Sequence, residues 1–419
     1  MNFYLGIDFG TTGARVVAID AAGTLHAEAQ YPFNTGDLDN LPALWQTALL
    51  TLISQIPQQV RRDLKAIAIN GTSSTVLLCD AGGSPIAEPL LYNDGRGVAV
   101  MQELKAIAPP NHPVISATSS LAKLLWFRQN SNLPLQKHFF LHQADWLAFL
   151  LHGRLGISDY HNALKLGYDP ERLCYPNWLL DIKLLPHLSE IVKPGMPVGA
   201  VTTEIAERFG LPADCQVCAG TTDSIAAFLA SGVQSPGEAV TSLGSTLVIK
   251  LLSRTRIDDA RYGIYSHRLE DMWLVGGASN TGGAVLRQFF TDTELETLSR
   301  QIDAEQESPL DYYPLTKAGD RFPINDPNLP PRLEPRPDNP VEFLHGLLES
   351  MARIEAQAYQ LLQELGATKL TRVYTAGGGA KNPVWSAIRE RLLKVPVGVP
   401  VHTEAAYGTA LLAMRGLNQ

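Results

Sequence analysis

The residues near the start of the chain that could do chemistry are Asp8 and the turn that follows it, Gly10-Thr11-Thr12-Gly13. Two short apolar runs flank this turn, which predicts a β-hairpin. Backbone N–H groups in a glycine-rich turn form a concavity that binds anions. A carboxylate beside such a site suits Mg²⁺, which is bound by one or two carboxylates together with phosphate oxygens. The alternative is a plain turn between two strands, capped by Asp8.

A second stretch repeats this pattern. Leu243-Gly244-Ser245-Thr246 also joins two apolar runs, and it is similar to Phe9-Gly10-Thr11-Thr12. Two hairpins of one type predict two related halves, each with its own strand–turn–strand.

A run of three glycines, Gly377-Gly378-Gly379, follows the strand-like residues Arg372–Ala376 and precedes a helix start at Asn382-Pro383. Glycine allows the backbone to approach a ligand closely, and a helix N-terminus favours anions. The turn is neither a P-loop nor a dinucleotide fingerprint, because the spacing of both motifs is missing. An ordinary strand-to-helix turn is the alternative.

Asp223 stands where a predicted strand over 218–222 meets a predicted helix over 224–231. Aspartate is a preferred helix N-cap. It is also a candidate general base, which must be ionised to accept a proton from an attacking hydroxyl. The two roles are compatible, because a helix N-terminus favours the ionised carboxylate.

The elements that must position these residues belong to an α/β protein, because strand-like and helical runs alternate. A strand over 65–70 leads into Gly71-Thr72-Ser73, and helices are expected over 38–56, 143–151, 340–365 and about 405–414. Residues 309–340 are dense in proline. They also contain many apolar groups, so we expect an ordered loop packed on the second half, in place of a flexible linker.

Bulk composition fits a globular protein of two or three domains. The chain has 419 residues, of which 45% are hydrophobic and 18% charged, and its net charge is −8. This charge argues against a broad nucleic-acid surface. No apolar run is long enough to span a membrane, and the first residues do not resemble a signal peptide. Cys215 and Cys218 lie three apart on a predicted strand and have no matching second pair, which argues against zinc and favours the reducing cytoplasm.

Taken together, these motifs resemble the FGGY carbohydrate kinases, which belong to the superfamily of actin-like, sugar-kinase and heat-shock ATPases. The resemblance runs through nearly the whole chain. The matching segments are Asp8–Gly13, Gly220–Asp223, Ser242–Thr246, Asn280–Gly283, Gly319–Pro323, Gly377–Asn382 with Trp385, and Glu404–Gly408. It implies two actin-like (RNase H-like) domains with an ATP and sugar cleft between them. The order of the motifs places these domains at 1–222, with the sugar and the first phosphate motif, and 223–419, with the nucleotide.

Within the family, the chain is most similar to the small ribulose/xylulose-type kinases of cyanobacteria and plants. The similar segments are 67–73 and 159–167. Asn70 stands where that subgroup would have an acid, and Tyr92-Asn-Asp94-Gly-Arg96 follows the Trp-x-Asp-x-Arg of larger kinases only in part. These departures concern the sugar and leave the phosphoryl-transfer motifs intact.

The resemblance assigns roles residue by residue. Asp223 is expected to be the catalytic base, and Asp8 to hold Mg²⁺. Gly71, Thr72 and Ser73 are expected to bind the sugar, together with Asp8 and Asp223. The residues expected to bind ATP are Gly10, Thr11, Thr12, Gly13, Gly244, Ser245, Thr246, Gly282, Gly377, Gly378, Gly379, Asn382 and Trp385.

The implied reaction is ATP-dependent phosphorylation of a ketopentose at its terminal hydroxyl, with D-ribulose converted to D-ribulose 5-phosphate. One alternative is a kinase for xylulose, glycerol or another polyol. Another is an actin-like or chaperone-like ATPase, although that class lacks the Gly-x-x-Asp–helix–Gly run around Asp223. A regulatory sugar-binding protein is a third, and the intact Asp8 and Asp223 argue against it. The expected partner is a small sugar, with no nucleic acid or membrane, and the protein is expected to be a monomer or homodimer.

Overall fold

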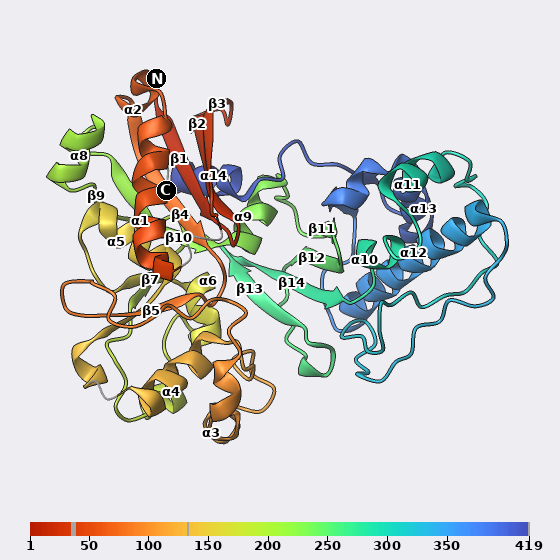
Figure 1. Ribbon diagram of the computed structural model, residues 1–419, viewed down its shortest axis with the longest axis horizontal. Coiled ribbons are helices and arrows are strands. Elements are labelled where there is room, and N and C mark those ends of the chain that lie inside the picture. The colour runs from red at the N-terminus through yellow and green to blue at the C-terminus, as the bar shows by residue number, and fades with distance from the viewer. Residues whose placement is uncertain (35–38, 132–133, 418–419) are drawn as a thin grey trace. The chain divides into compact units, whose positions relative to one another are not determined.

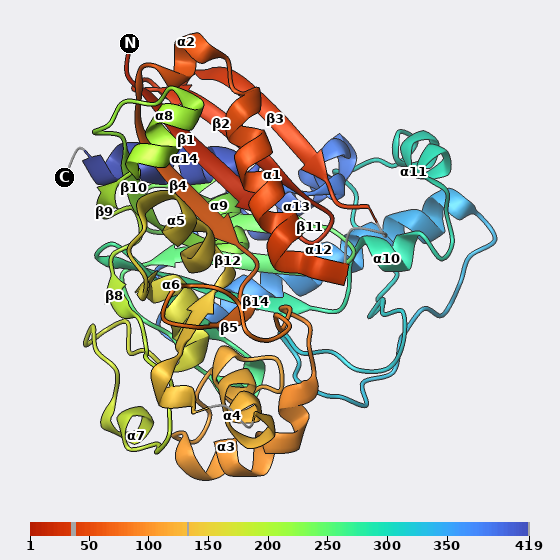
Figure 2. The ribbon, with the colours of Figure 1, turned by 60° about the vertical axis from the view of Figure 1, so that its left-hand side comes forward.

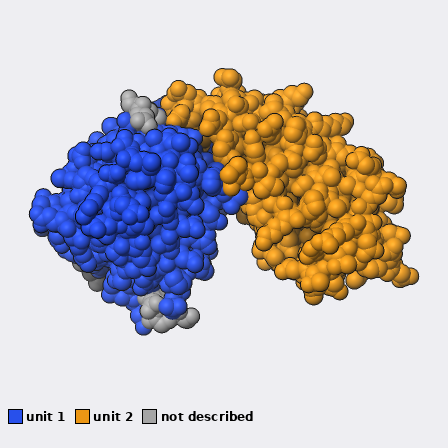
Figure 3. Space-filling model, turned by 90° about the horizontal axis from the view of Figure 1, so that it is seen from above, with its two compact units in different colours: residues 1–230, 402–419 blue, residues 231–401 orange. Residues whose placement is uncertain are grey.

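The computed structural model describes residues 1–34, 39–131 and 134–417. The chain forms two compact units (Figures 1 and 3). Unit 1 consists of residues 1–230 and 402–419, and unit 2 of residues 231–401. The chain therefore leaves unit 1, builds unit 2 and returns.

This division differs from the predicted boundary after residue 222 in two places. Helix α9 (Asp223–Ala230) and helix α14 (Ala405–Leu417) both belong to unit 1. The reason is packing: α14 lies against α9 and against the central strands of the first sheet. Gly408 permits this approach, because a Cβ there would lie 1.8 Å from the carbonyl oxygen of Ala226. The order of motifs along the chain does not predict that α14 packs in unit 1.

The sheet of unit 1 has six strands in the order β3-β2-β1-β4-β10-β9. β1 and β2 form the predicted hairpin, and β4 and β10 continue the sheet parallel to β1. The strands are β1 (Phe3–Phe9), β2 (Gly13–Asp20), β3 (Leu25–Pro32), β4 (Leu64–Gly71), β9 (Pro197–Ala200) and β10 (Gln216–Thr222). The carboxyl ends of β1, β4 and β10 therefore meet at one edge.

Both faces of this sheet are covered at its centre, which explains why β1 and β4 are almost wholly buried. Leu5 and Ile7 face a core shared with α1 (Leu41–Gln55), whereas Tyr4 faces the side covered by α14. Figure 2 shows α1 and α14 on opposite sides of β1 and β4. Because side chains alternate along a strand, Asp8 belongs with Tyr4 on the side of α14.

The remaining elements of unit 1 surround this sheet. The helices are α1, α2 (Gln58–Arg61), α3 (Met101–Ile107), α4 (Ser120–Asn130), α5 (Gln143–His152), α6 (Tyr160–Ala163), α7 (Asn177–Leu180), α8 (Thr203–Phe209), α9 and α14. Two small sheets each have two strands. One pairs β5 (Val76–Cys79) with β6 (Phe139–His142), and the other pairs β7 (Ile157–Asp159) with β8 (Glu190–Val192). The helices predicted over 38–56 and 143–151 correspond to α1 and α5. Leu38, the predicted first residue of α1, lies outside the described residues.

Unit 2 repeats the arrangement of unit 1. Its sheet has the order β13-β14-β12-β11-β15-β16, in which β11 and β12 form a hairpin and β11 pairs in parallel with β15. The strands are β11 (Glu238–Leu243), β12 (Leu247–Ser253), β13 (Tyr265–Leu269), β14 (Met272–Ser279), β15 (Arg372–Ala376) and β16 (Val397–Gly398), and the helices are α10 (Gly283–Leu286), α11 (Asp292–Ser299), α12 (Pro340–Glu364) and α13 (Pro383–Leu393). The prediction of two related halves is confirmed.

The longest helix, α12, begins and ends as the sequence predicts. The side chain of Asn339 accepts a hydrogen bond from Val341 N at the N-terminus, and Pro340 occupies the first turn. Gly366, with a φ of +102°, follows its C-terminus. The apolar face of α12 covers the sheet of unit 2.

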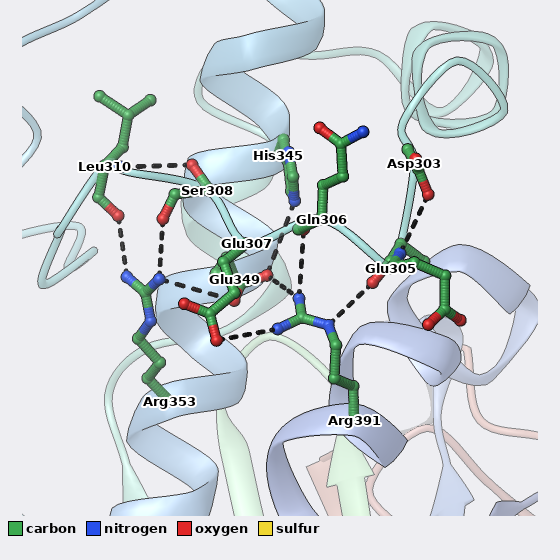
Figure 4. A network of polar contacts seen from close by, with 11 residues as sticks. Asp303, Glu305, Gln306, Glu307, Ser308, Leu310, His345, Glu349, Arg353 and Arg391 are labelled. Carbon is green, nitrogen blue, oxygen red and sulfur yellow. Dashed lines mark hydrogen bonds and ion pairs between the residues drawn. The ribbon is translucent and has the colours of Figure 1, made fainter.

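The proline-dense segment is an ordered loop on unit 2, as predicted. Phe322 is fully buried in the unit 2 core, and Tyr312 donates a hydrogen bond to Pro335 O. Figure 4 shows how the start of this segment is held against α12: Arg353 donates to Ser308 O and Leu310 O. In the same network Arg391 of α13 donates to Glu349, a fully buried carboxylate on α12.

None of the described helices combines the length and apolar character needed to cross a membrane. Cys215 and Cys218 are buried free thiols, and burial raises the pKa of each to about 12.

Candidate active site

Unit 1 contains a cavity of about 500 Å³ at the edge where the carboxyl ends of its parallel strands meet. Asp223, the predicted catalytic base, and Asp8, the predicted metal ligand, both line it. The turn of the first hairpin and Thr72 line it as well. Residues that the sequence predicts for metal, phosphate, sugar and proton transfer therefore share one cavity.

Strand register brings the two carboxylates together. In the parallel ladders, Gly71 of β4 lies opposite both Phe9 of β1 and Thr222 of β10. Asp8 comes one residue before this level and Asp223 one residue after it, so the two carboxylates lie close to the same end of the sheet. Asp223 is the first residue of α9, and its Oδ1 accepts a hydrogen bond of 2.7 Å from Ser224 N.

The surroundings of Asp8 disfavour the ionised form of its carboxyl group. Burial raises its pKa to about 6, and the neighbouring charge of Asp223 acts in the same direction, whereas Arg15 opposes the shift. Its Oδ1 is buried and has no hydrogen-bond partner among the described residues. An unsatisfied buried carboxylate oxygen beside a second carboxylate is suited to a divalent cation, for which oxygen ligands are preferred.

The turn of the first hairpin exposes groups that can meet phosphate. Gly10 N donates to Gly13 O, which closes the turn, and Thr11 and Thr12 are exposed beside the cavity. Gly13 has a structural reason to be glycine, because a Cβ there would lie 2.8 Å from Tyr31 O on β3.

The predicted sugar-facing turn is held in place by Gln143, the first residue of α5. Its Oε1 accepts a 3.1 Å hydrogen bond from Thr72 N and a 3.3 Å bond from the Thr72 hydroxyl. A Cβ on Gly71 would lie 2.9 Å from the same oxygen. Thr72 lines the cavity. Gly71 and Ser73 are its neighbours in the turn and are not among the residues that line the cavity. Gln143 was not among the predicted site residues, since its position only marked a helix start.

The cavity also has an ion pair beside it, which the sequence patterns did not predict. Arg15 of β2 lines the cavity and pairs with Glu404, both about half exposed. Hairpin register is a signal that could have found Arg15, because it lies directly opposite Asp8. Arg15 is a cation next to the turn that would hold phosphate.

In unit 2 the second hairpin turn is wrapped by the segment that contains Gly282. Gly283 N donates to Gly244 O at 2.9 Å, and Ala284 N donates to Ser245 O at 3.1 Å. Gly282 is buried with a φ of +144°, and a Cβ there would lie 2.8 Å from Thr246 Cα. Gly282 therefore shapes the turn from behind.

The triple glycine packs against the second hairpin. A Cβ on Gly377 would lie 2.7 Å from Leu243 O, and one on Gly379 would lie 2.6 Å from Leu243 Cβ. These two glycines therefore allow close approach to the hairpin, and the predicted approach of the run to a ligand stays a prediction. Only Gly378 is both exposed and open, with no atom within 4 Å of an added Cβ. Gly378 begins a 3₁₀ turn over Gly378–Lys381, and this turn precedes α13.

Asn382 and Trp385 support this turn. Asn382 accepts a hydrogen bond from Trp385 N and so caps α13, and its amide donates to Ser299 Oγ at 2.8 Å. Trp385 is only 3% exposed and packs in the unit 2 core against Gly379. Trp385 therefore exposes almost no surface of its own, and its predicted part in ATP binding stays a prediction.

Comparison with known proteins identifies the family of the chain. The profile of the N-terminal domain of the FGGY family of carbohydrate kinases matches residues 3–230, and that of the C-terminal domain matches residues 239–417. The chain belongs to the FGGY family of carbohydrate kinases. It is thus a sugar kinase, and ATP is the phosphate donor of this family.

Individual FGGY relatives are distant. A xylulose kinase of Staphylococcus epidermidis (strain RP62A) is 23% identical over 99% of this chain and 88% of its own length. A gluconokinase of Bacillus subtilis is 22% identical over 99% of this chain and 87% of its own. A crystal structure of a "xyloylose kinase" from Brucella ovis superposes with a TM-score of 0.86 and 23% identity, covering 99% of this chain and 90% of the other. The similarity to the small kinases of cyanobacteria and plants stays a prediction.

Proposed function

We propose that this FGGY kinase transfers the γ-phosphate of ATP to the terminal hydroxyl of a ketopentose, with D-ribulose as the first candidate. The observation that carries the proposal is the cavity in which Asp8, Asp223, Thr72 and the first hairpin turn meet. Phosphoryl transfer depends mainly on positioning and charge stabilisation, and these are the groups it requires.

Asp223 is the proposed general base. It stands at a strand-to-helix junction on the cavity wall, where a helix N-terminus favours the ionised form. It would take the proton of the attacking hydroxyl, which for a ketopentose is the hydroxyl at C5. Thr72 and Ser73 would orient the sugar by hydrogen bonds.

Mg²⁺ is proposed at Asp8, because its buried Oδ1 has no partner among the described residues. When bound, the ion would neutralise phosphate charge. Arg15 adds a fixed positive charge on the same cavity wall.

ATP contacts are proposed in both units. Thr11 and Thr12 would approach the γ-phosphate, and Gly244, Ser245 and Thr246 would hold the β- and γ-phosphates. Gly378 is the glycine of the triple run that is open to a ligand. The residues proposed for ATP are thus divided between the two units.

Asp223→Asn tests the base directly. The substitution keeps the size and polarity of the side chain but removes its proton-accepting charge, so kcat should fall by about 10²–10⁴-fold. ATP affinity should stay unchanged. Steady-state ADP release with D-ribulose and ATP titration calorimetry measure the two quantities.

Asp214→Asn, at a mostly exposed aspartate two residues before β10, serves as the control and should retain full turnover. A kcat for Asp223→Asn within threefold of the parent would remove Asp223 from the mechanism.

Xylulose is the second candidate acceptor, because the Staphylococcus epidermidis relative is named a xylulose kinase. ADP release measured across ribulose, xylulose, ribitol, arabitol and glycerol separates the candidates. The highest kcat/KM should fall on D-ribulose, and a higher value on xylulose would reassign the substrate. ATP hydrolysis that none of these sugars stimulates would instead favour an ATPase without sugar transfer.

A further inference from the structure

A buried lysine on α4 holds two segments of unit 1 together. Lys123 is fully buried, and its Nζ donates hydrogen bonds to Ser74 O at 2.7 Å and to Leu91 O at 2.6 Å. Both acceptors are backbone carbonyls, and the described part of the chain gives Lys123 no ion-pair partner. A lysine that neither reaches water nor pairs with a carboxylate is unusual and requires a reason.

The first carbonyl belongs to the turn that holds Thr72 and Ser73. Ser74 has a φ of +65°, a conformation that costs free energy for a residue with a Cβ. Its buried hydroxyl also has no hydrogen-bond partner among the described residues. Local preferences therefore do not account for this backbone conformation. Besides the bonds of Gln143 to Thr72, the turn has the bond from Lys123 to Ser74 O as a tertiary contact.

The second carbonyl belongs to the segment 91–96. Leu91 O also accepts a hydrogen bond from Asp94 N, and Asp94 pairs with Arg96 at 2.9 Å. Trp126, three residues after Lys123 on the same face of α4, lies under the Arg96 guanidinium with 5.2 Å between centres. Helix α4 thus supports both segments from one side.

Holding a charge in this position is unfavourable. Burial lowers the pKa of Lys123 to about 8, although the charge of Asp94 opposes the shift. An apolar side chain of similar length would fill the same space at lower cost. The two hydrogen bonds are therefore the feature that distinguishes lysine at this position.

We infer that Lys123 is a positioning residue for the sugar acceptor, fixing the Thr72–Ser74 turn and the Leu91–Arg96 segment relative to each other. The inference rests on the proposed function, in which that turn orients the sugar. Lys123 lies beneath both segments and is assigned no contact with substrate.

Lys123→Met is the principal variant, with Lys123→Gln as a second one that keeps a shorter donor. The KM for the sugar should rise about tenfold in Lys123→Met and less in Lys123→Gln, because Ser74 O loses the donor that Lys123 supplies and Leu91 O keeps only the bond from Asp94 N. The KM for ATP should change less than twofold. An equal rise in both KM values, or a loss of folded protein with an unchanged sugar KM in the remainder, would overturn the inference.

Hydrogen exchange gives a readout that needs no catalysis. In the unliganded full chain, Lys123→Met should speed exchange in peptides covering residues 72–78 and 90–96 and leave those covering 64–70 unchanged. If only one of the two segments responds, Lys123 does not link them. If the parent enzyme phosphorylates no sugar of the panel, the proposed function fails, and exchange still decides the role of Lys123.

Ser74→Gly separates positioning from general stability. Glycine accepts a positive φ without strain and removes the unsatisfied hydroxyl. The double variant Lys123→Met with Ser74→Gly should therefore recover at least half of the lost sugar affinity. No recovery, together with unchanged exchange at 72–78, would show that Lys123 serves packing alone.

Discussion

Asp8 is a residue whose surroundings disfavour its charge while its proposed role requires it. Burial and the nearby Asp223 raise its pKa, and its Oδ1 lacks a hydrogen bond within the described residues. Such an arrangement is expected where a bound cation supplies the missing charge.

Asp8→Asn should leave the fold intact, because the amide has the same shape. We expect kcat to fall at least about 100-fold, as a charged ligand is lost from a phosphoryl-transfer site. The dependence of the rate on Mg²⁺ should also flatten. A magnesium titration of the steady-state rate checks both, and a midpoint equal to that of the parent would remove Asp8 from the metal site.

His152 provides a pH prediction away from the active site. Burial lowers its pKa to about 4 from an ordinary value of 6.5, and the charge of Arg154 adds to this. Because the folded pKa lies below the unfolded one, the unfolded chain binds more protons between these values. Stability from this residue is therefore complete above about pH 6.5 and falls by about 3 kcal/mol as the pH drops to 4.

His152→Asn keeps an acceptor for the amide of Arg154 but cannot be protonated. Relative to the parent, this variant should gain stability on going from pH 8 to pH 5, measured by urea unfolding. His187→Asn, at an exposed histidine, is the control and should change stability by less than about 0.5 kcal/mol at either pH. A pH-independent difference for His152→Asn would contradict the assignment.

Among the elements of unit 2, two helices are joined beneath the strands that lead to the second hairpin turn and the triple glycine. Arg389 of α13 makes a two-pronged ion pair with Glu355 of α12, with bonds of 2.6 and 2.8 Å, and both side chains are fully buried. Arg389 also donates to Thr375 of β15, and Thr241 of β11 donates to Glu355. The network therefore reaches β11 and β15, the two strands that end directly before Gly244 and Gly377.

Removing one partner of this pair should be severe. Glu355→Ala leaves a buried guanidinium without its carboxylate, so we expect a loss of about 3–5 kcal/mol in unfolding free energy. Glu296→Ala, which breaks the exposed pair with Arg300, should cost less than about 1 kcal/mol. Urea unfolding of the two variants compares them, and similar midpoints would show that the buried pair adds nothing.

The sequence was informative about elements whose cause is local. The hairpin at Asp8 and the caps of α12 follow from alternation and from capping residues, and the structure has both. The triple glycine was assigned a ligand, although Gly377 and Gly379 serve contacts with Leu243. Lys123 gave no signal at all, because a lysine in a helix is ordinarily exposed, and its burial depends on segments 30 and 50 residues away.

For the molecule as a whole, the decisive feature is that α14 completes unit 1 after the chain has built unit 2. Gly6 and Gly408 make this possible. A Cβ on Gly6 would lie 2.1 Å from Ala406 O, and one on Gly408 would lie 1.8 Å from Ala226 O. Sequence patterns predict α14 as a helix but carry no information on which unit it joins.

Gly408→Ala should therefore separate α14 from α9 and destabilise unit 1 by about 1–3 kcal/mol, the usual cost of overpacking. Gly398→Ala is the matched control, since no atom lies within 4 Å of an added Cβ there. Thermal unfolding of both variants tests this, and a transition for Gly408→Ala as high as for the control would show that α14 is not tightly docked.

Because α14 belongs to unit 1 but is the last helix to be synthesised, unit 1 can finish folding only after unit 2 has been made. Synthesis of residues 1–230 supplies the strands of the first sheet, but the helix that covers one of its faces is made only after residues 231–401. At ribosomal rates of roughly 5–20 residues per second, this interval lasts about 10–30 s. During that time the apolar face formed by Tyr4, Val17 and Ala68 has no α14 to cover it. The nascent chain is therefore most exposed to chaperones and to aggregation while unit 2 is being made.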